Sequence, residues 1–203
     1  MTYRSAMSGP LAAAMCALVA AAQTPPKFDP AAMQKQLEAL QKAMEGSARE
    51  ASPCVDHREL KALLPEKIGQ FTRKSASSER NSAMGMTMVT AEATYEGPKG
   101  GQLKLTLSDL AGAGAAAVFG RMTMAAVEVD REGDEGYEKS RLISGHKALE
   151  TYRHRDRSGN IVLQADRFQV EVQGSQIPPE ILSEAVQAID LKALTALKPA
   201  GAK

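Results

Sequence analysis

Apolar and polar residues alternate along several stretches of the second half of the chain. Leu103, Leu105 and Leu107 alternate with three polar residues, a pattern that predicts a strand with one buried and one solvated face. Runs of this kind, separated by turn residues, predict strands over 68–74, 86–95, 102–109, 137–143, 147–153, 160–165 and 168–172. We therefore expect a sheet assembled largely from sequential hairpins.

Helical spacing replaces this alternation at three places. Asp56 and Glu59 form the start signal of a short helix that ends before Pro65, the alanine-rich stretch 113–126 is too long for a hairpin loop, and Pro178-Pro179 opens a last helix. The order βββ-α-ββββ-α predicts the α+β class, with an antiparallel sheet of about six to seven strands and packed helices.

A further amphipathic helix is expected near the N-terminus, where Asp29 and Pro30 form a preferred helix start. Its apolar residues Met33, Leu37, Leu40 and Met44 are spaced by four, three and four positions. The apolar stripe that these residues would form on the helix is too short to support a stable coiled coil alone. It is expected either to pack on its own domain or to support oligomerisation through residues 30–45.

The first residues are typical of a signal peptide. Arg4 supplies a positive charge, Leu11 to Ala22 is uncharged and apolar, and Ala20-Ala21-Ala22 offers a cleavage site. The apolar run is too short to span a bilayer, so we expect no transmembrane span in the mature chain and a periplasmic or secreted location. The predicted organisation is a signal peptide over 1–22, a leader, helix and linker over 23–55, the α+β domain over 56–197 and a tail over 198–203.

Charge and cysteine content narrow the possible partners. The formal net charge is +1. The chain therefore lacks the excess of basic residues that is typical of a nucleic-acid-binding protein. Cys54 is the one cysteine expected to remain after cleavage, so no internal disulfide is predicted. It lies in a linker, where its position does not require burial, and its thiol is expected to be inert, the alternative being an intermolecular bridge.

Methionines offer the sharpest chemical feature. Met84, Met86 and Met88 alternate within a predicted strand, which would point three thioethers to one side. Thioether sulfur suits Cu(I) in an oxidising compartment, and Met122 and Met124 are possible further ligands. Packing of the methionines in the core is the competing interpretation.

Other candidate sites carry weaker patterns. The acids of 130–136 alternate like those of a calcium loop, but Arg141 stands where a bidentate glutamate belongs, so a solvated turn is expected. His57, His146 and His154 are too scattered along the chain to suggest one zinc site. The nucleophile-elbow, zinc-protease and C-x-x-C motifs are absent from the sequence.

The segment Leu64-Pro65-Glu66-Lys67-Ile68-Gly69-Gln70-Phe71, with Gly136-Tyr137-Glu138-Lys139 and Asp166-Arg167-Phe168, resembles a family of uncharacterised exported bacterial proteins. The likeness extends from about Asp56 to Leu197, and Gln70 stands where the pattern has a second glycine. The order of elements is also similar to that of Mog1/PsbP-like domains. That resemblance implies a binding or assembly module, although architecture alone does not fix function.

These observations predict an exported envelope protein that acts as a non-catalytic binding module for another envelope protein or a small ligand, without a cofactor. Two alternatives stay open. One is a periplasmic Cu(I)-binding protein that uses Met84, Met86 and Met88, and the other is an enzyme with an unrecognised site.

Overall fold

A computed structural model describes residues 52–83 and 86–199 of the protein. The predicted signal peptide, leader and N-terminal amphipathic helix, including residues 30–45, lie outside the described residues, as does most of the predicted tail. The described residues all belong to the unit that spans residues 39–203.

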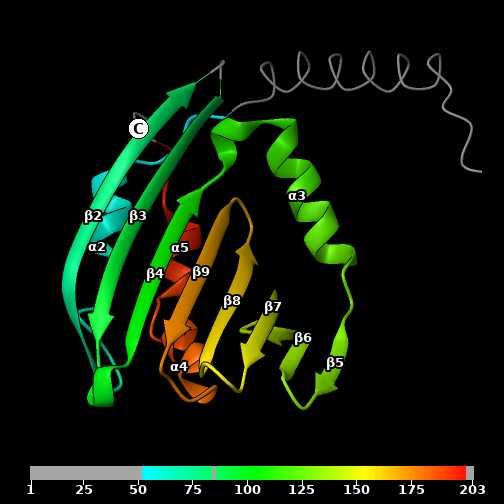
Figure 1. Ribbon diagram of the computed structural model, residues 1–203. Coiled ribbons are helices and arrows are strands. Elements are labelled where there is room, and N and C mark those ends of the chain that lie inside the picture. Colours follow the sequence, from blue (N-terminus) through cyan, green and yellow to red (C-terminus); the bar gives the residue numbers. More distant parts are fainter. Residues whose placement is uncertain (1–51, 84–85, 200–203) are drawn as a thin grey trace, which may run out of the picture. The chain divides into compact units, whose positions relative to one another are not determined.

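A nine-stranded antiparallel sheet organises the described part of the chain, in the order β1-β2-β3-β4-β9-β8-β7-β6-β5. β4 and β9 are adjacent in the middle, although they are far apart in sequence, and they pair from Gln102↔Ser175 to Asp109↔Phe168 (Figure 1). The strands are β1 (Lys67–Ile68), β2 (Phe71–Ala83), β3 (Met86–Glu96), β4 (Gln102–Asp109), β5 (Asp130–Gly133), β6 (Gly136–Ile143), β7 (His146–Arg153), β8 (Ser158–Ala165) and β9 (Phe168–Ser175).

Four α-helices accompany the sheet in this region. They are α2 (His57–Ala62), α3 (Ala115–Ala126), α4 (Glu180–Gln187) and α5 (Leu191–Ala196). The carboxylate of Asp56 accepts a hydrogen bond from the backbone N–H of Arg58 and so caps α2, as the sequence predicts. α3 links the central strand β4 to the edge strand β5 (Figure 1).

One face of the sheet is buried and the other is polar. The register places the inward residues of neighbouring strands opposite one another, as in the row Ala93, Leu105, Val172 and Ile161. All four are at most 1 % exposed. Because the side-chain period of a strand is two, the residues between them point to the opposite face.

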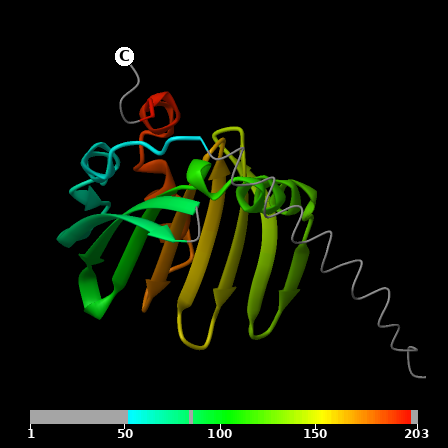
Figure 2. The same cartoon turned by 90° about the horizontal axis from the view of Figure 1, so that it is seen from above.

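Helices α2, α4 and α5 supply the other half of the core. Leu60 of α2, Leu182 of α4 and Leu194 of α5 are fully buried in the same cluster as the inward residues of the strands. Figure 2 shows these three helices together on one side of the sheet. The central strands therefore have a helix-covered face and a face without these helices.

A buried ion pair closes one end of this core. Asp109 continues the inward row of β4 and is completely buried. Its carboxylate accepts hydrogen bonds from Arg167 Nη2 at 2.7 Å and Nε at 2.9 Å, and from the backbone N–H of Val55 at 2.8 Å. Arg167 Nη2 also donates to the carbonyl of Pro53 at 2.6 Å. The pair therefore ties the segment before α2 to the two central strands.

Cys54 lies in this tied segment and is a buried free thiol, 3 % exposed. Burial, followed by the nearby Asp109 carboxylate, raises the pKa of the Cys54 thiol. A raised pKa keeps the sulfur in the unreactive thiol form. Burial agrees with the expected inert cysteine, and Cys54 and Val55 belong to the core although the sequence suggested a linker up to residue 55.

The α+β class and the antiparallel sheet agree with the sequence analysis, but the estimate of six to seven strands was too low. The predicted strand over 68–74 is interrupted at Gly69, whose φ of +53° makes a tight turn between β1 and β2. The predicted acidic turn contains the edge strand β5, whose four residues are all exposed. Such a strand has no apolar alternation by which to recognise it.

None of the helices in the described residues combines the length and the apolar character needed to cross a membrane.

Candidate functional site

Besides the Asp109–Arg167 pair, two places on the described structure concentrate polar side chains. One is a buried cluster around Glu150 on the helix-covered face, and the other is a hollow on the polar face. They differ in how many of their hydrogen-bonding groups are already used.

The buried cluster is centred on Glu150 of β7, which is 2 % exposed. Tyr137 of β6 donates its hydroxyl to Glu150 Oε1 at 2.5 Å, and Arg141 Nη2 lies 2.5 Å from Glu150 Oε2. Arg141 also donates to the hydroxyl of Ser183 on α4. The cluster therefore joins two strands to the helix that covers them.

Burial dominates the electrostatics of this cluster. It is the largest cause that raises the pKa of Tyr137 above its ordinary value, and the hydrogen bond and negative charge of Glu150 raise the pKa further. The Arg141 guanidinium opposes this rise. The phenol consequently stays protonated and remains a donor to the carboxylate well above neutral pH.

Aromatic rings border the cluster. Tyr137 stacks on Tyr152 with ring centroids 5.8 Å apart, and His154 meets Tyr152 edge-on at 5.6 Å. Lys139 Nζ lies 4.2 Å from the Tyr137 ring centroid, within the range of a cation–π contact. These contacts fix the orientation of the Tyr137 hydroxyl toward Glu150.

The cluster is better suited to holding elements together than to chemistry. Glu150 has a donor at one oxygen and a cation at the other, so neither oxygen is free to take a proton from a substrate. Arg141 Nε is buried without a hydrogen-bond partner in the described structure, and Glu150 Oε2 contacts the guanidinium as an ion pair without hydrogen-bond geometry. Buried charges of this kind need their partners, because loss of one partner leaves the other uncompensated.

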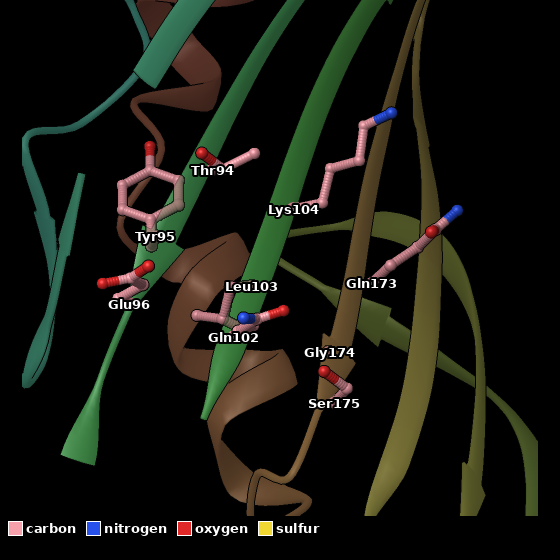
Figure 3. A pocket seen from close by; sticks show the side chains of 9 residues that line it. All are labelled: Thr94, Tyr95, Glu96, Gln102, Leu103, Lys104, Gln173, Gly174 and Ser175. Atoms are coloured by element: carbon pink, nitrogen blue, oxygen red, sulfur yellow. The ribbon is translucent and has the colours of Figure 1, made fainter. Parts of the chain in front are cut away.

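The second place is a hollow of about 440 Å³ on the polar face, over β3, β4 and β9 (Figure 3). The side chains of Thr94, Lys104 and Gln173 form one transverse row, because Lys104 pairs with Thr94 on one side and with Gln173 on the other. The remaining lining residues are Tyr95, Glu96, Gln102, Leu103, Gly174 and Ser175.

The charges at this hollow are balanced. Lys104 Nζ lies 2.9 Å from Glu92 Oε1, and Glu96 Oε2 lies 3.2 Å from Lys74 Nζ. In contrast, the amide of Gln102 and the hydroxyl of Ser175 are exposed and have no hydrogen-bond partner within residues 52–83 and 86–199. The hollow therefore offers hydrogen-bond donors and acceptors with little net charge.

The predicted methionine set is only partly described. Met86 and Met88 lie on the polar face of β3, since Val89 and Ala91 point into the core, and Met88 is 41 % exposed. Met84 lies outside the described residues. Met122 of α3 is 67 % exposed and Met124 is partly exposed.

Histidines and acids do not form a metal site in the described ranges, where no three His, Cys, Asp or Glu side chains come together in a metal-binding arrangement. His146 begins β7 and His154 follows its last residue. His57 instead lies 2.8 Å from the hydroxyl of Ser78 through Nδ1.

Comparison with known proteins gives no relative: no protein-family model, no curated protein and no solved structure matches the chain. The site therefore has to be interpreted from its own geometry.

Sequence reasoning missed both buried ion pairs and the hollow. A signal for the ion pairs exists, because Glu150 lies between Ala148 and Tyr152 at an inward position, and Asp109 follows Leu103, Leu105 and Leu107 at the same period. A charged residue on the apolar side of an alternating strand predicts a buried partner. The hollow has no such signal, because it depends on three strands and on the pairing of β4 with β9.

The Tyr137–Glu150 hydrogen bond predicts a pH-dependent stability. Tyr137→Phe removes the donor to a buried carboxylate and is expected to lower the free energy of unfolding at pH 7 by about 1.5–3 kcal/mol. Tyr152→Phe, the matched control, removes a bond from a hydroxyl to the neutral carbonyl of Ile177 and is expected to cost about 1 kcal/mol.

The raised pKa of Tyr137 determines whether stability rises or falls with pH. Above about pH 10 the unfolded chain has released the Tyr137 proton, whereas the folded chain keeps it. Tyr137 should therefore make the wild type lose stability as pH rises, by up to about 1.4 kcal/mol per pH unit. Tyr95, whose pKa is also raised, adds the same loss to the wild type and to Tyr137→Phe. Tyr137→Phe should reduce this slope in urea unfolding at pH 9, 10 and 11. Parallel curves for wild type and Tyr137→Phe would contradict the assignment.

Proposed function

We propose that the mature protein is exported and acts as a non-catalytic binding module, and that it recognises its ligand or partner on the polar face of the sheet. The observation that carries this proposal is the hollow over β3, β4 and β9, on the face opposite α2, α4 and α5. The signal-like leader and the resemblance to exported proteins support the location.

The chemistry of the hollow defines what fits it. Its charged residues are paired with neighbours, whereas the side chains of Gln102 and Ser175 offer neutral hydrogen-bonding groups. A ligand or protein surface with amide or hydroxyl groups and little net charge is therefore favoured over a phosphate-rich one. Ligand sites are commonly concave with a few convergent polar groups of this kind.

The spatial separation of the two polar clusters favours binding over catalysis. Tyr137 and the buried carboxylate of Glu150 lie on the helix-covered face, because Tyr137 is opposite the buried Tyr152 in the register and Glu150 is itself buried. The hollow lies on the other face. Burial raises the pKa of Tyr95, which lines the hollow, but its buried hydroxyl already donates to the carbonyl of Pro65. The hollow therefore lacks a convergent pair of titratable groups among the described residues.

The binding proposal is tested with a double variant and a control of the same composition. Lys104→Ala with Gln173→Ala removes the row across the hollow, whereas Lys192→Ala with Gln187→Ala removes the same residue types from exposed positions on α5 and α4. Mature wild-type protein purified from the periplasm serves as the bait, and its N-terminal peptide should begin at Gln23. A component that this bait captures from an envelope extract is then titrated against the wild type, the hollow variant and the control variant.

We expect the affinity to fall about tenfold or more for Lys104→Ala/Gln173→Ala, because truncated contacts at the centre of an interface commonly cost at least 1–2 kcal/mol. The control should bind like the wild type. Equal affinity of the wild type and the hollow variant would remove the polar face from the proposal. Intact, unprocessed chain in the cytoplasm would contradict export.

A second candidate is Cu(I) binding, which is favoured by one observation. Met86 and Met88 share the polar face, and Met88 is 41 % exposed, so their sulfur atoms are not both consumed by core packing. Anaerobic Cu(I) titration of the wild type should then show binding that Met84→Leu/Met86→Leu/Met88→Leu abolishes. Met33→Leu/Met44→Leu, which leaves every candidate ligand in place, is the control for methionine content. Equal weak binding by all three proteins would end the copper candidate.

A further inference from the structure

Among residues 52–83 and 86–199, only a short part of the outer edge of the long strand β2 is paired. Its inner side pairs with β3 from Thr72 to Ala83. On the outer side, β1 pairs only with Phe71 and Thr72, and the N–H of Arg73 donates to the carbonyl of Glu66. From Ser75 to Ala83, the outward backbone groups have no hydrogen-bond partner within the described residues. Figure 1 shows β2 on this side of the sheet, beside β3.

The strand at the other edge of the same sheet, β5, has features that discourage pairing with a further strand. β5 has four residues, all exposed, and two of them are the acids Asp130 and Glu132. Short length and charge are common ways to prevent the pairing of edge strands. In β2, the stretch from Ser75 to Ala83 contains neither proline nor lysine, and its charges are limited to the adjacent Glu79 and Arg80. This edge is therefore suited to accept another strand.

Helix α2 does not cover the edge. Two hydrogen bonds join the region of α2 to inward-facing residues of β2. His57 of α2 contacts the hydroxyl of Ser78, and Arg80 of β2 donates to the carbonyl of Val55, just before α2. Leu60 of α2 is buried in the core below the sheet. These contacts place α2 over the face of β2 and β3, so α2 does not cover the outward backbone groups of β2.

We infer that a second copy of this chain pairs with β2 along this edge, so that two sheets join in one antiparallel sheet around a twofold axis. A twofold interface brings the same surface of both copies together, which requires a self-complementary edge. Residues opposite each other in antiparallel strands point to the same face. A continuous sheet with both cores on one side therefore requires a register centred on a single residue.

The charges of β2 and the length of its free stretch select one such register. A register centred on Glu79 would put two glutamates opposite each other, and one centred on Arg80 would do the same with two arginines. Like charges directly opposite destabilise a strand pair. A register centred on Ser77 would put Arg80 opposite Lys74, which is also a like-charge pair. A register centred on Ser78 avoids all of these pairs, because Glu79 then faces Ser77 and Arg80 faces Ala76 of the second copy. It also pairs the longest remaining part of the free stretch, from Ser75 to Asn81. The near-neutral net charge of +1 adds little repulsion between copies.

Oppositely charged variants at Ser77 test this register. In it, Ser77 of each copy faces Glu79 of the other, so Ser77→Lys creates two opposite-charge pairs and Ser77→Glu creates two like-charge pairs. Each favourable pair stabilises by roughly 0.2–1 kcal/mol, so the dimer dissociation constant should fall roughly two- to thirtyfold for Ser77→Lys and rise by a similar factor for Ser77→Glu. Sedimentation equilibrium of the full mature chain measures both changes.

An intrachain effect has to be separated from the dimer effect. Ser77 pairs with Glu92 of β3 in the same copy, so both substitutions also change monomer stability slightly. Thermal unfolding of each variant at a concentration far below the dissociation constant measures that contribution. A change in unfolding without a change in dissociation constant would overturn the inference.

Cysteine crosslinking identifies the register directly. Ser75 of one copy faces Asn81 of the other only when the pairing is centred on Ser78. In a mixture of Ser75→Cys and Asn81→Cys chains, diamide oxidation of the two thiols should form a disulfide heterodimer, and neither variant alone should crosslink. A wild type that stays monomeric at several hundred micromolar would overturn the inference. So would an absence of heterodimer, or a monomer that binds a foreign peptide strand at this edge.

Discussion

One-sided burial of the sheet is the constraint on which the rest of the structure depends. The inward residues of β3, β4, β9 and β8 form continuous apolar rows under the helices, and the alternate residues are left on the polar face. A slip of one residue in any strand pair would turn its apolar side chains outward, so burial fixes the register of the central strands. The position of the polar row at Thr94, Lys104 and Gln173 is a consequence of the same register.

Two ion pairs occupy inward positions where the apolar rows end. Asp109 with Arg167 closes the core near the segment that precedes α2, and Glu150 with Arg141 closes it between β7, β6 and α4. In both cases an arginine on another element supplies the compensating charge for a carboxylate that is at most 2 % exposed. Burial of such charges contributes little net stability, but each carboxylate tolerates only an arrangement that brings its arginine close. The pairs thus restrict how the elements join.

The sequence predicted the strands and helices that carry a strong local pattern. The Leu103–Leu107 alternation identified β4, and the Asp56 cap identified α2, since both signals lie within a few residues. β5 and the extension of β2 to Ala83 escaped notice because their residues are polar and exposed. Their strand structure is imposed by neighbours rather than by their own side chains, which is common at the edges of a sheet.

Site prediction was weaker for a related reason. The inward parity of Glu150 and Asp109 was visible in the sequence, but the identity of their partners was not, because Arg141 and Arg167 approach through strand pairing. The hollow depends on β9 lying beside β4, a contact between segments far apart in the chain. The methionine pattern was visible, yet its chemistry depends on the surroundings of Met84, Met86 and Met88 rather than on their spacing.

The most direct test of this account is a cysteine-accessibility scan across β4 and β9 in the full mature chain. Lys104→Cys, Thr106→Cys and Gln173→Cys lie on the polar face, whereas Leu105→Cys and Val172→Cys lie on the covered face, and buried Cys54 serves as the internal reference. With a polar maleimide under native conditions, the first three thiols should react rapidly, and the last two should stay unmodified like Cys54. Protection of the first three as strong as that of the last two would contradict an open polar face.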